Sequence, residues 1–264
     1  FIAKEQIVPA HLVKGLLGVC GLSSFAVTFI LYAALFGIPS FLQIVQNQST
    51  KESGGFLIFI IISLSIGSLR SGYLLKSINI DVKPLSLWIS FASVGFTLVG
   101  MILVFEVLKV PEPYDSDIGW KVVISVGLTT MGLGYGSYLV SALITVVALV
   151  GKEGQAAATG MNYLFRSIGQ VLGVGVSLAI YDRSISNKLH SILNNVDHGD
   201  EIMEKLLHDT NYLKQGKLIT EKLFYKLLKA YQEAMIDFFV PALALGVFSL
   251  LVSGVVAIKY GKSK

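Results

Sequence analysis

Long uninterrupted runs of apolar residues dominate this chain, and short polar segments separate them. None of the runs alternates apolar and polar residues at period two, as the strands of a membrane barrel do. A run of about twenty apolar residues is long enough to cross a bilayer as a helix, whose backbone groups pair internally. The pattern therefore predicts an all-α membrane protein, a six-transmembrane-helix bundle with helices at residues 16–45, 55–75, 85–108, 121–150, 156–181 and 235–258.

The fifth run carries the most unusual polar positions. Arg166 lies ~18 to 21 Å along the helix from the charged turn that precedes it, which is too deep for a helix-end charge. At helical spacing Asn162, Arg166 and Gln170 fall on one stripe. Such a stripe is expensive against lipid, so we expect it to line a polar translocation path. The alternative is a purely structural bond from the arginine to helix carbonyls.

Two other runs also place polar residues on one side. They are Ser24, Thr28, Tyr32 and Gln43 in the first run, and Ser137, Ser141 and Thr145 in the fourth. Serine and threonine can instead bond the carbonyls of their own helix. A polar stripe facing lipid gains nothing, so three one-sided stripes favour a cavity. We expect the first, second, fourth and fifth helices to line it, with the third and sixth as outer supports.

Small residues recur at four-residue spacing, which lets helix backbones approach closely. They are Ser63, Gly67 and Ser71 in the second run, Gly132 and Gly136 in the fourth, and Gly169 and Gly173 in the fifth. Gly134 lies between the two glycines of the fourth run, and three alternate glycines also permit bending. The sequence therefore predicts packing at all these sites and a hinge at Gly132, Gly134 and Gly136.

One connection is much longer than the others. We expect residues 182–234 to form a loop on the non-cytosolic side, with an amphipathic helix near residues 223–231. Its histidines, His190, His198 and His208, match no zinc spacing. We expect them to be solvated, and the alternative is a pH sensor that an acidic lumen would protonate. The predicted organisation is a cytosolic lead-in at 1–15, five helices within 16–181, this loop, the sixth helix at 235–258 and a cytosolic tail at 259–264.

Composition agrees with a membrane protein, since 53% of the residues are hydrophobic and only 14% are charged. The runs contain no phosphate-binding loop, zinc-protease pattern or nucleophile with a nearby base. The sequence therefore predicts no enzyme activity, no cofactor and no metal site. The lysines are scattered over short loops, which argues against a nucleic-acid partner.

The lysines are distributed unevenly between the two sides of the predicted bundle. Those that share a side with the start of the chain are Lys4, Lys14, Lys76, Lys83, Lys152, Lys259, Lys262 and Lys264. The short loops on the other side carry fewer lysines and several acids. The positive-inside rule therefore predicts that both ends of the chain are cytosolic.

Four ionisable side chains lie within the predicted spans: Arg70, Glu106, Arg166 and Asp237. Glu106 and Asp237 lie near the outer ends, where they can anchor a helix at the interface or carry protons. Arg70 lies near the cytosolic end, and its long side chain can reach that surface.

Several segments, taken in order, resemble a known family. They are FGIPSFLQIVQ at 36–46, GSLRSGYLLKS at 67–77, GLGYGSYLVSAL at 132–143 and the run AAATGMNYLFRSIGQVLGVGVS from residue 156. Together they are similar to the carboxyl half of a major facilitator superfamily transporter. The likeness is greatest to the fourteen-spanner drug:proton antiporters, and among these to the fungal vacuolar basic amino acid transporters.

The resemblance implies a proton-coupled antiporter that moves basic amino acids or related cations from the cytosol into the vacuole. Its partners would be the amino half of the same transporter, protons, a small cationic substrate and the lipid bilayer. The alternatives are a multidrug efflux antiporter of the plasma membrane and a non-transporting truncated scaffold. The first residue, Phe1, is not a start residue, so we expect the chain to be a piece of a larger protein.

Overall fold

The computed structural model describes residues 15–77, 81–109, 118–194, 196, 198–208, 212–215 and 219–261. The predicted lead-in and the last residues of the tail lie outside these ranges. Every regular element within the ranges is a helix. The helices are α2 (Leu16–Ile44), α3 (Thr50–Ser77), α4 (Val82–Leu108), α5 (Ile118–Leu193), α6 (Gly199–His208), α7 (Tyr212–Gln215) and α8 (Glu221–Tyr260).

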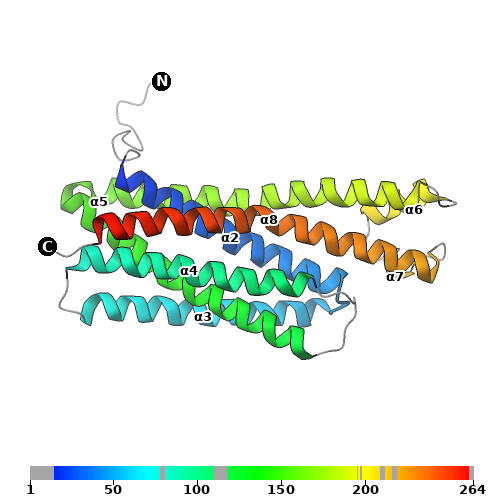
Figure 1. Cartoon of the computed structure of the whole chain (residues 1–264), viewed down its shortest axis with the longest axis horizontal. Coiled ribbons are helices and arrows are strands. Elements are labelled where there is room, and N and C mark those ends of the chain that lie inside the picture. Colours follow the sequence, from blue (N-terminus) through cyan, green and yellow to red (C-terminus); the bar gives the residue numbers. More distant parts are fainter. Residues whose placement is uncertain are drawn as a thin grey trace, which may run out of the picture.

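Six helical segments in the described ranges are long and apolar enough to cross a membrane. They are Leu16–Ile44, Thr50–Ser77, Val82–Leu108, Ile118–Gly151, Gly154–Leu193 and Glu221–Tyr260. The predicted all-α bundle of six spans is therefore confirmed. In Figure 1, α2 begins and α8 ends on the same side of the bundle, as an even number of spans requires.

A sharp turn at Gly151 divides α5 into two arms. Its backbone has φ 69° and ψ −171°, a conformation that residues with a side chain rarely adopt. The first arm, Ile118–Gly151, and the second arm, Gly154–Leu193, run in opposite directions on either side of this turn (Figure 1). The fourth and fifth predicted spans are these two arms.

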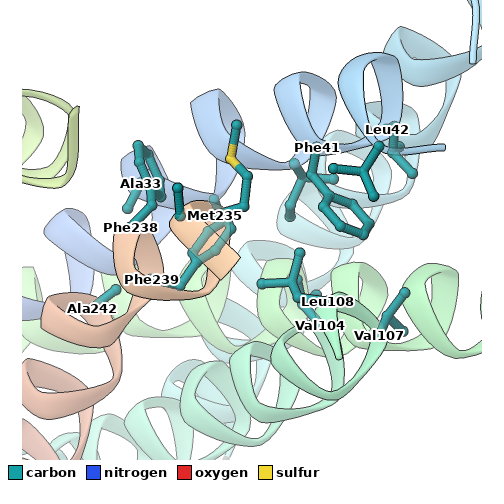
Figure 2. Packing of buried hydrophobic residues seen from close by; sticks show 14 of the residues in the cluster. Ala33, Phe41, Leu42, Val104, Val107, Leu108, Met235, Phe238, Phe239 and Ala242 are labelled. Carbon is teal, nitrogen blue, oxygen red and sulfur yellow. The ribbon is translucent and has the colours of Figure 1, made fainter. Parts of the chain in front are cut away.

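A continuous apolar core joins the helices. Near one end of the bundle, Phe41 of α2, Leu108 of α4 and Phe239 of α8 are fully buried. Figure 2 shows that the labelled side chains of these three helices point toward one another. Burial of large side chains in this way removes apolar surface from its surroundings and gains dispersion contacts. The core therefore fixes α8 against both α2 and α4.

Close helix contacts lie at the predicted small residues. A side chain at Gly67 would meet the backbone of Leu133, and one at Gly136 would meet the backbone of Leu64. These contacts hold α3 against the first arm of α5. In the second arm, Gly169 and Gly173 lie in the same way against the backbone of α2. The glycines thus permit the close approach of three helices.

The segment between the last two spans is more helical than its sequence predicts. The second arm of α5 continues to Leu193, and α8 begins at Glu221, so the expected amphipathic helix is the first part of α8 itself. Leu227, Leu228 and Tyr231 are buried there rather than laid against a membrane surface. With α6 and α7, these ends form an extension that projects beyond α2 and α4 (Figure 1).

Candidate functional site

The stripe on the second arm of α5 passes from the inside of the bundle to its surface. Asn162 is buried, Arg166 is half-buried and Gln170 is exposed. Each four-residue step advances a helical position by about 40°, so a stripe of this spacing drifts around the helix. The structure therefore brings Arg166 and Gln170 to an open face and places Asn162 against neighbouring helices.

Asn162 is joined by a hydrogen bond to α2 and, through Ser24 of that helix, to the first arm of α5. The Ser24 hydroxyl of α2 donates to Asn162 Oδ1 at 2.6 Å. The same hydroxyl lies 3.2 Å from the hydroxyl of Tyr138, which belongs to the first arm of α5. These bonds satisfy polar groups that would otherwise be costly in an apolar interior. They fix the second arm one turn before Arg166.

The other polar positions of α2 separate into an inner and an outer group. Thr28 is buried, and its hydroxyl lies 3.5 Å from that of Tyr135. Tyr32 is half-buried. Gln43 is half-buried near the end of α2, where its Oε1 lies 3.5 Å from the hydroxyl of Thr50. Fifteen residues of helix separate Thr28 from Gln43, or about 22 Å. The candidate residues of α2 therefore do not form one site.

The polar residues of the first arm of α5 bond to the helices beside it. Ser137 donates to the Gly67 carbonyl of α3 at 3.0 Å. Ser141 accepts from Ser90 of α4 at 2.9 Å. Thr145 donates to Ser86, also of α4, at 2.8 Å. Hydrogen bonds therefore join the first arm of α5 to α3 on one side and to α4 on the other.

These bonds show a role for α4 that we did not predict from the sequence. Ser86, Ser90, Ser93 and Thr97 of this helix are all buried, although we predicted α4 to be an outer support. Their spacing of four, three and four residues places them on one helix face. That spacing was the signal available in the sequence. The third span is therefore part of the polar interior.

A small chamber lies at the centre of these hydroxyl groups. Its volume is about 30 Å³, and Ser90, Tyr138, Thr145 and Ser253 are among the residues that line it. A space of this size holds about one water molecule, which needs several polar partners. It is far too small for an amino acid.

Arg166 lies half-buried on the open face of the second arm of α5. Its guanidinium carbon lies 5.2 Å from the centre of the Tyr163 ring, a cation–π distance. Its Nε is buried without a hydrogen-bond partner. No carboxylate in the described ranges forms an ion pair with it. Within the described residues, the guanidinium therefore has a donor that no hydrogen bond satisfies.

The carboxylates near the outer helix ends are already engaged. Glu106 accepts from Lys109 at 2.7 Å. Asp237 accepts from Ser184 at 2.5 Å, and Lys188 lies 3.9 Å from the same carboxylate. Lys188 also bonds Glu233 at 3.0 Å. The bonds of Asp237 and Glu233 connect α5 to α8 where the extension begins, whereas the Glu106 pair lies at the end of α4.

Comparison with known proteins identifies transporters as relatives. No protein-family model matches the chain. It is 29% identical to vacuolar basic amino acid transporter 1 of Saccharomyces cerevisiae, over 96% of the chain and 48% of that protein. It is 33% identical to vacuolar basic amino acid transporter 2 of the same yeast, over 72% of the chain and 37% of that protein.

A third relative carries a different name. The chain is 29% identical to multidrug resistance protein fnx1 of Schizosaccharomyces pombe, over 85% of the chain and 41% of that protein. The chain thus spans less than half the length of each of these relatives. They are named for transport or drug resistance, which agrees with a multi-pass helical bundle and with a non-enzyme.

Proposed function

We propose that this chain is the carboxyl half of a proton-coupled major facilitator transporter of the vacuolar membrane. The transporter moves basic amino acids, or related cationic small molecules, from the cytosol into the vacuole. The observation that carries the proposal is the similarity to vacuolar basic amino acid transporter 1, which extends over 96% of the chain. Six apolar spans with polar groups between them are consistent with it.

The proposed mechanism is alternating access between two halves, with the substrate near the middle of the membrane between them. The amino half is the proposed partner, because the relatives are about twice as long as this chain. Of the six spans, α3 and the second arm of α5 are the least buried in the bundle. We assign the face that carries Arg166 and Gln170 to the path between the halves.

A cationic substrate needs a carboxylate partner in a site of low polarity. In the part of the chain that the structure describes, Glu106 and Asp237 lie toward the outer helix ends and are paired there. We therefore assign the carboxylate that binds the substrate's side chain to the amino half. Arg166 is the residue of this half that can hold the substrate's own carboxylate, or pair with an acid across the path.

Drug efflux is the second candidate, and the similarity to multidrug resistance protein fnx1 favours it. The two candidates share the fold and the path and differ in substrate. A drug site is mainly apolar, whereas an amino acid site must match two charges. The free donors of Arg166 match a carboxylate, which a basic amino acid has and many drugs lack.

Uptake by sealed vacuolar vesicles tests the function. Vesicles that contain the full-length protein should accumulate labelled lysine and arginine when their interior is acidic. Vesicles without the protein, and vesicles whose proton gradient has been collapsed, should not. Uptake that ignores the gradient would remove proton coupling from the proposal. Gradient-dependent export of drugs without lysine uptake would favour the second candidate.

Protease protection tests the proposed orientation. Tags at Lys4 and Lys264, which lie outside the described residues, should be cleaved by protease added to intact vacuoles, because the lysine bias places both ends in the cytosol. A tag between residues 195 and 209 should be protected until detergent opens the membrane. Cleavage of that tag in intact vacuoles would reverse the orientation.

A further inference from the structure

A crevice between α3 and α4 lies apart from the region of Arg166. It has a volume of about 110 Å³ and lies against the first arm of α5. Arg70, Ser71 and Leu74 line it from α3, and Ala92 and Phe96 line it from α4. The two helices make few direct contacts, because the first arm of α5 packs against both and holds them apart. The crevice therefore remains open between them.

Ser71 points to a missing partner in this crevice. The residue is only 1% exposed, and its hydroxyl has no hydrogen-bond partner. Serines in apolar helices usually bond a carbonyl of the preceding turn, as Ser93 on the opposite wall does at 2.6 Å. A buried hydroxyl without a partner is unfavourable, so an acceptor from outside the protein is expected there.

Arg70 supplies a positive charge beside Ser71. It is exposed and forms no ion pair with a carboxylate in the described ranges. α3 is 28 residues long, or about 42 Å, which is roughly 12 Å more than the hydrocarbon layer. Arg70 lies seven residues before the last residue of α3, about 10 Å from that end and so about 4 Å inside the hydrocarbon boundary. A guanidinium at that depth can reach lipid phosphates.

The surroundings are basic at one end and apolar along the walls. Lys76 at the end of α3 and Lys83 at the start of α4 are exposed at the same end of this helix pair, and Asp81 is the exposed acid between them. Phe96, farther along the crevice, is 48% exposed. This combination matches a molecule with an anionic head and an apolar chain.

We propose that the crevice binds one anionic phospholipid of the surrounding leaflet. The phosphate pairs with Arg70, and the Ser71 hydroxyl donates to a phosphate or ester oxygen of the lipid. One acyl chain runs from there toward the membrane interior along Phe96 of α4. The site requires that α3 and α4 cross a bilayer, and it does not depend on the transported substrate.

Native mass spectrometry of the purified full-length protein tests this site. The protein in detergent is mixed with phosphatidylserine or with phosphatidylcholine of the same acyl chains. One phosphatidylserine should remain bound at roughly tenfold higher occupancy, because a phosphate and guanidinium form a charge-assisted bond that a zwitterionic head weakens. Arg70→Gln should remove that difference.

Two further variants separate the parts of the site. Ala92→Phe should lower the occupancy of both lipids, because its ring fills the crevice between the walls. Arg183→Gln, a matched change at an exposed arginine of the second arm of α5, should leave both occupancies unchanged. Soluble glycerophosphoserine in excess should not displace the lipid.

Three results would overturn the proposal. The first is equal retention of the two lipids by the unaltered protein. The second is an Arg70→Gln variant that keeps its preference for phosphatidylserine. The third is displacement by glycerophosphoserine, which would indicate a site for a free anion rather than for a lipid. Arg70 is exposed, so its substitution does not endanger the fold.

Discussion

Replacing Arg166 by alanine should abolish transport by the full-length protein, with uptake falling by at least about 100-fold. The guanidinium contacts the Tyr163 ring and has a buried Nε without a partner. Its remaining donors are therefore available to the carboxylate that we assign to the transport path. Removal of the arginine would leave that carboxylate without its partner. Uptake of labelled lysine per molecule of protein in the vacuolar membrane is the measurement.

Arg166→Lys tests whether the shape of the guanidinium matters, and Leu172→Ala is a control elsewhere on the same arm. Arg166→Lys should also be impaired, because an ammonium cannot make the forked, bidentate contact of a guanidinium. Leu172→Ala, at a 40% exposed position of the same arm, should have a mild effect. If Arg166→Ala transported at the normal rate, or if its whole loss came from degradation, the arginine would be structural.

Replacing Gly134 by leucine should reduce transport at least about tenfold and lower the unfolding temperature. A Cβ atom there would lie 2.5 Å from the Thr97 backbone nitrogen and 2.7 Å from the Ser93 carbonyl oxygen. Those atoms belong to the backbone of α4 and cannot turn aside as a flexible side chain can. The first arm of α5 must therefore move away from α4, which also disturbs the hydroxyl bonds between them.

The control for this variant is Gly160→Leu, in the second arm of α5. A Cβ atom at Gly160 would meet nothing within 4 Å, so the same substitution should change transport and unfolding little. The hinge that we predicted at Gly132, Gly134 and Gly136 is tested by comparing the unfolding temperature of Gly134→Leu with its transport rate. If Gly134→Leu kept its unfolding temperature but lost transport, bending would explain the loss better than packing. Normal transport would remove both explanations.

The number and order of the spans could be predicted from sequence because each apolar run is long enough to cross a bilayer as a helix. The turn at Gly151 could be predicted too, since glycine and charged residues interrupt two such runs. The helix ends within residues 182–234 were harder to predict from the sequence. Polar and charged residues follow Tyr181, yet the helix continues to Leu193 because Ile185 and Leu189 pack in the apolar core.

The polar contacts required knowledge of which helices are neighbours. Spacing placed Thr28 and Ser141 on helix faces, but it could not say that these faces meet tyrosines and serines of other helices rather than a cavity. For Arg166, spacing predicted a location deep in a helix. The half-exposed position and the ring of Tyr163 were added by the structure.

The second arm of α5 has a mechanical consequence that follows from its continuity. It runs for 40 residues from the turn at Gly151 into the extension, a rod of about 60 Å. If such a rod tilts by about 10° around its Gly151 end, its far tip moves by roughly 10 Å. The first turns of α8 would move with this tip, because Lys188 and Ser184 of α5 bond Glu233 and Asp237 there and Tyr231 is buried in the same core. A small tilt of the bundle would therefore change the position of the tip of the extension by a distance that a pair of spectroscopic labels can measure.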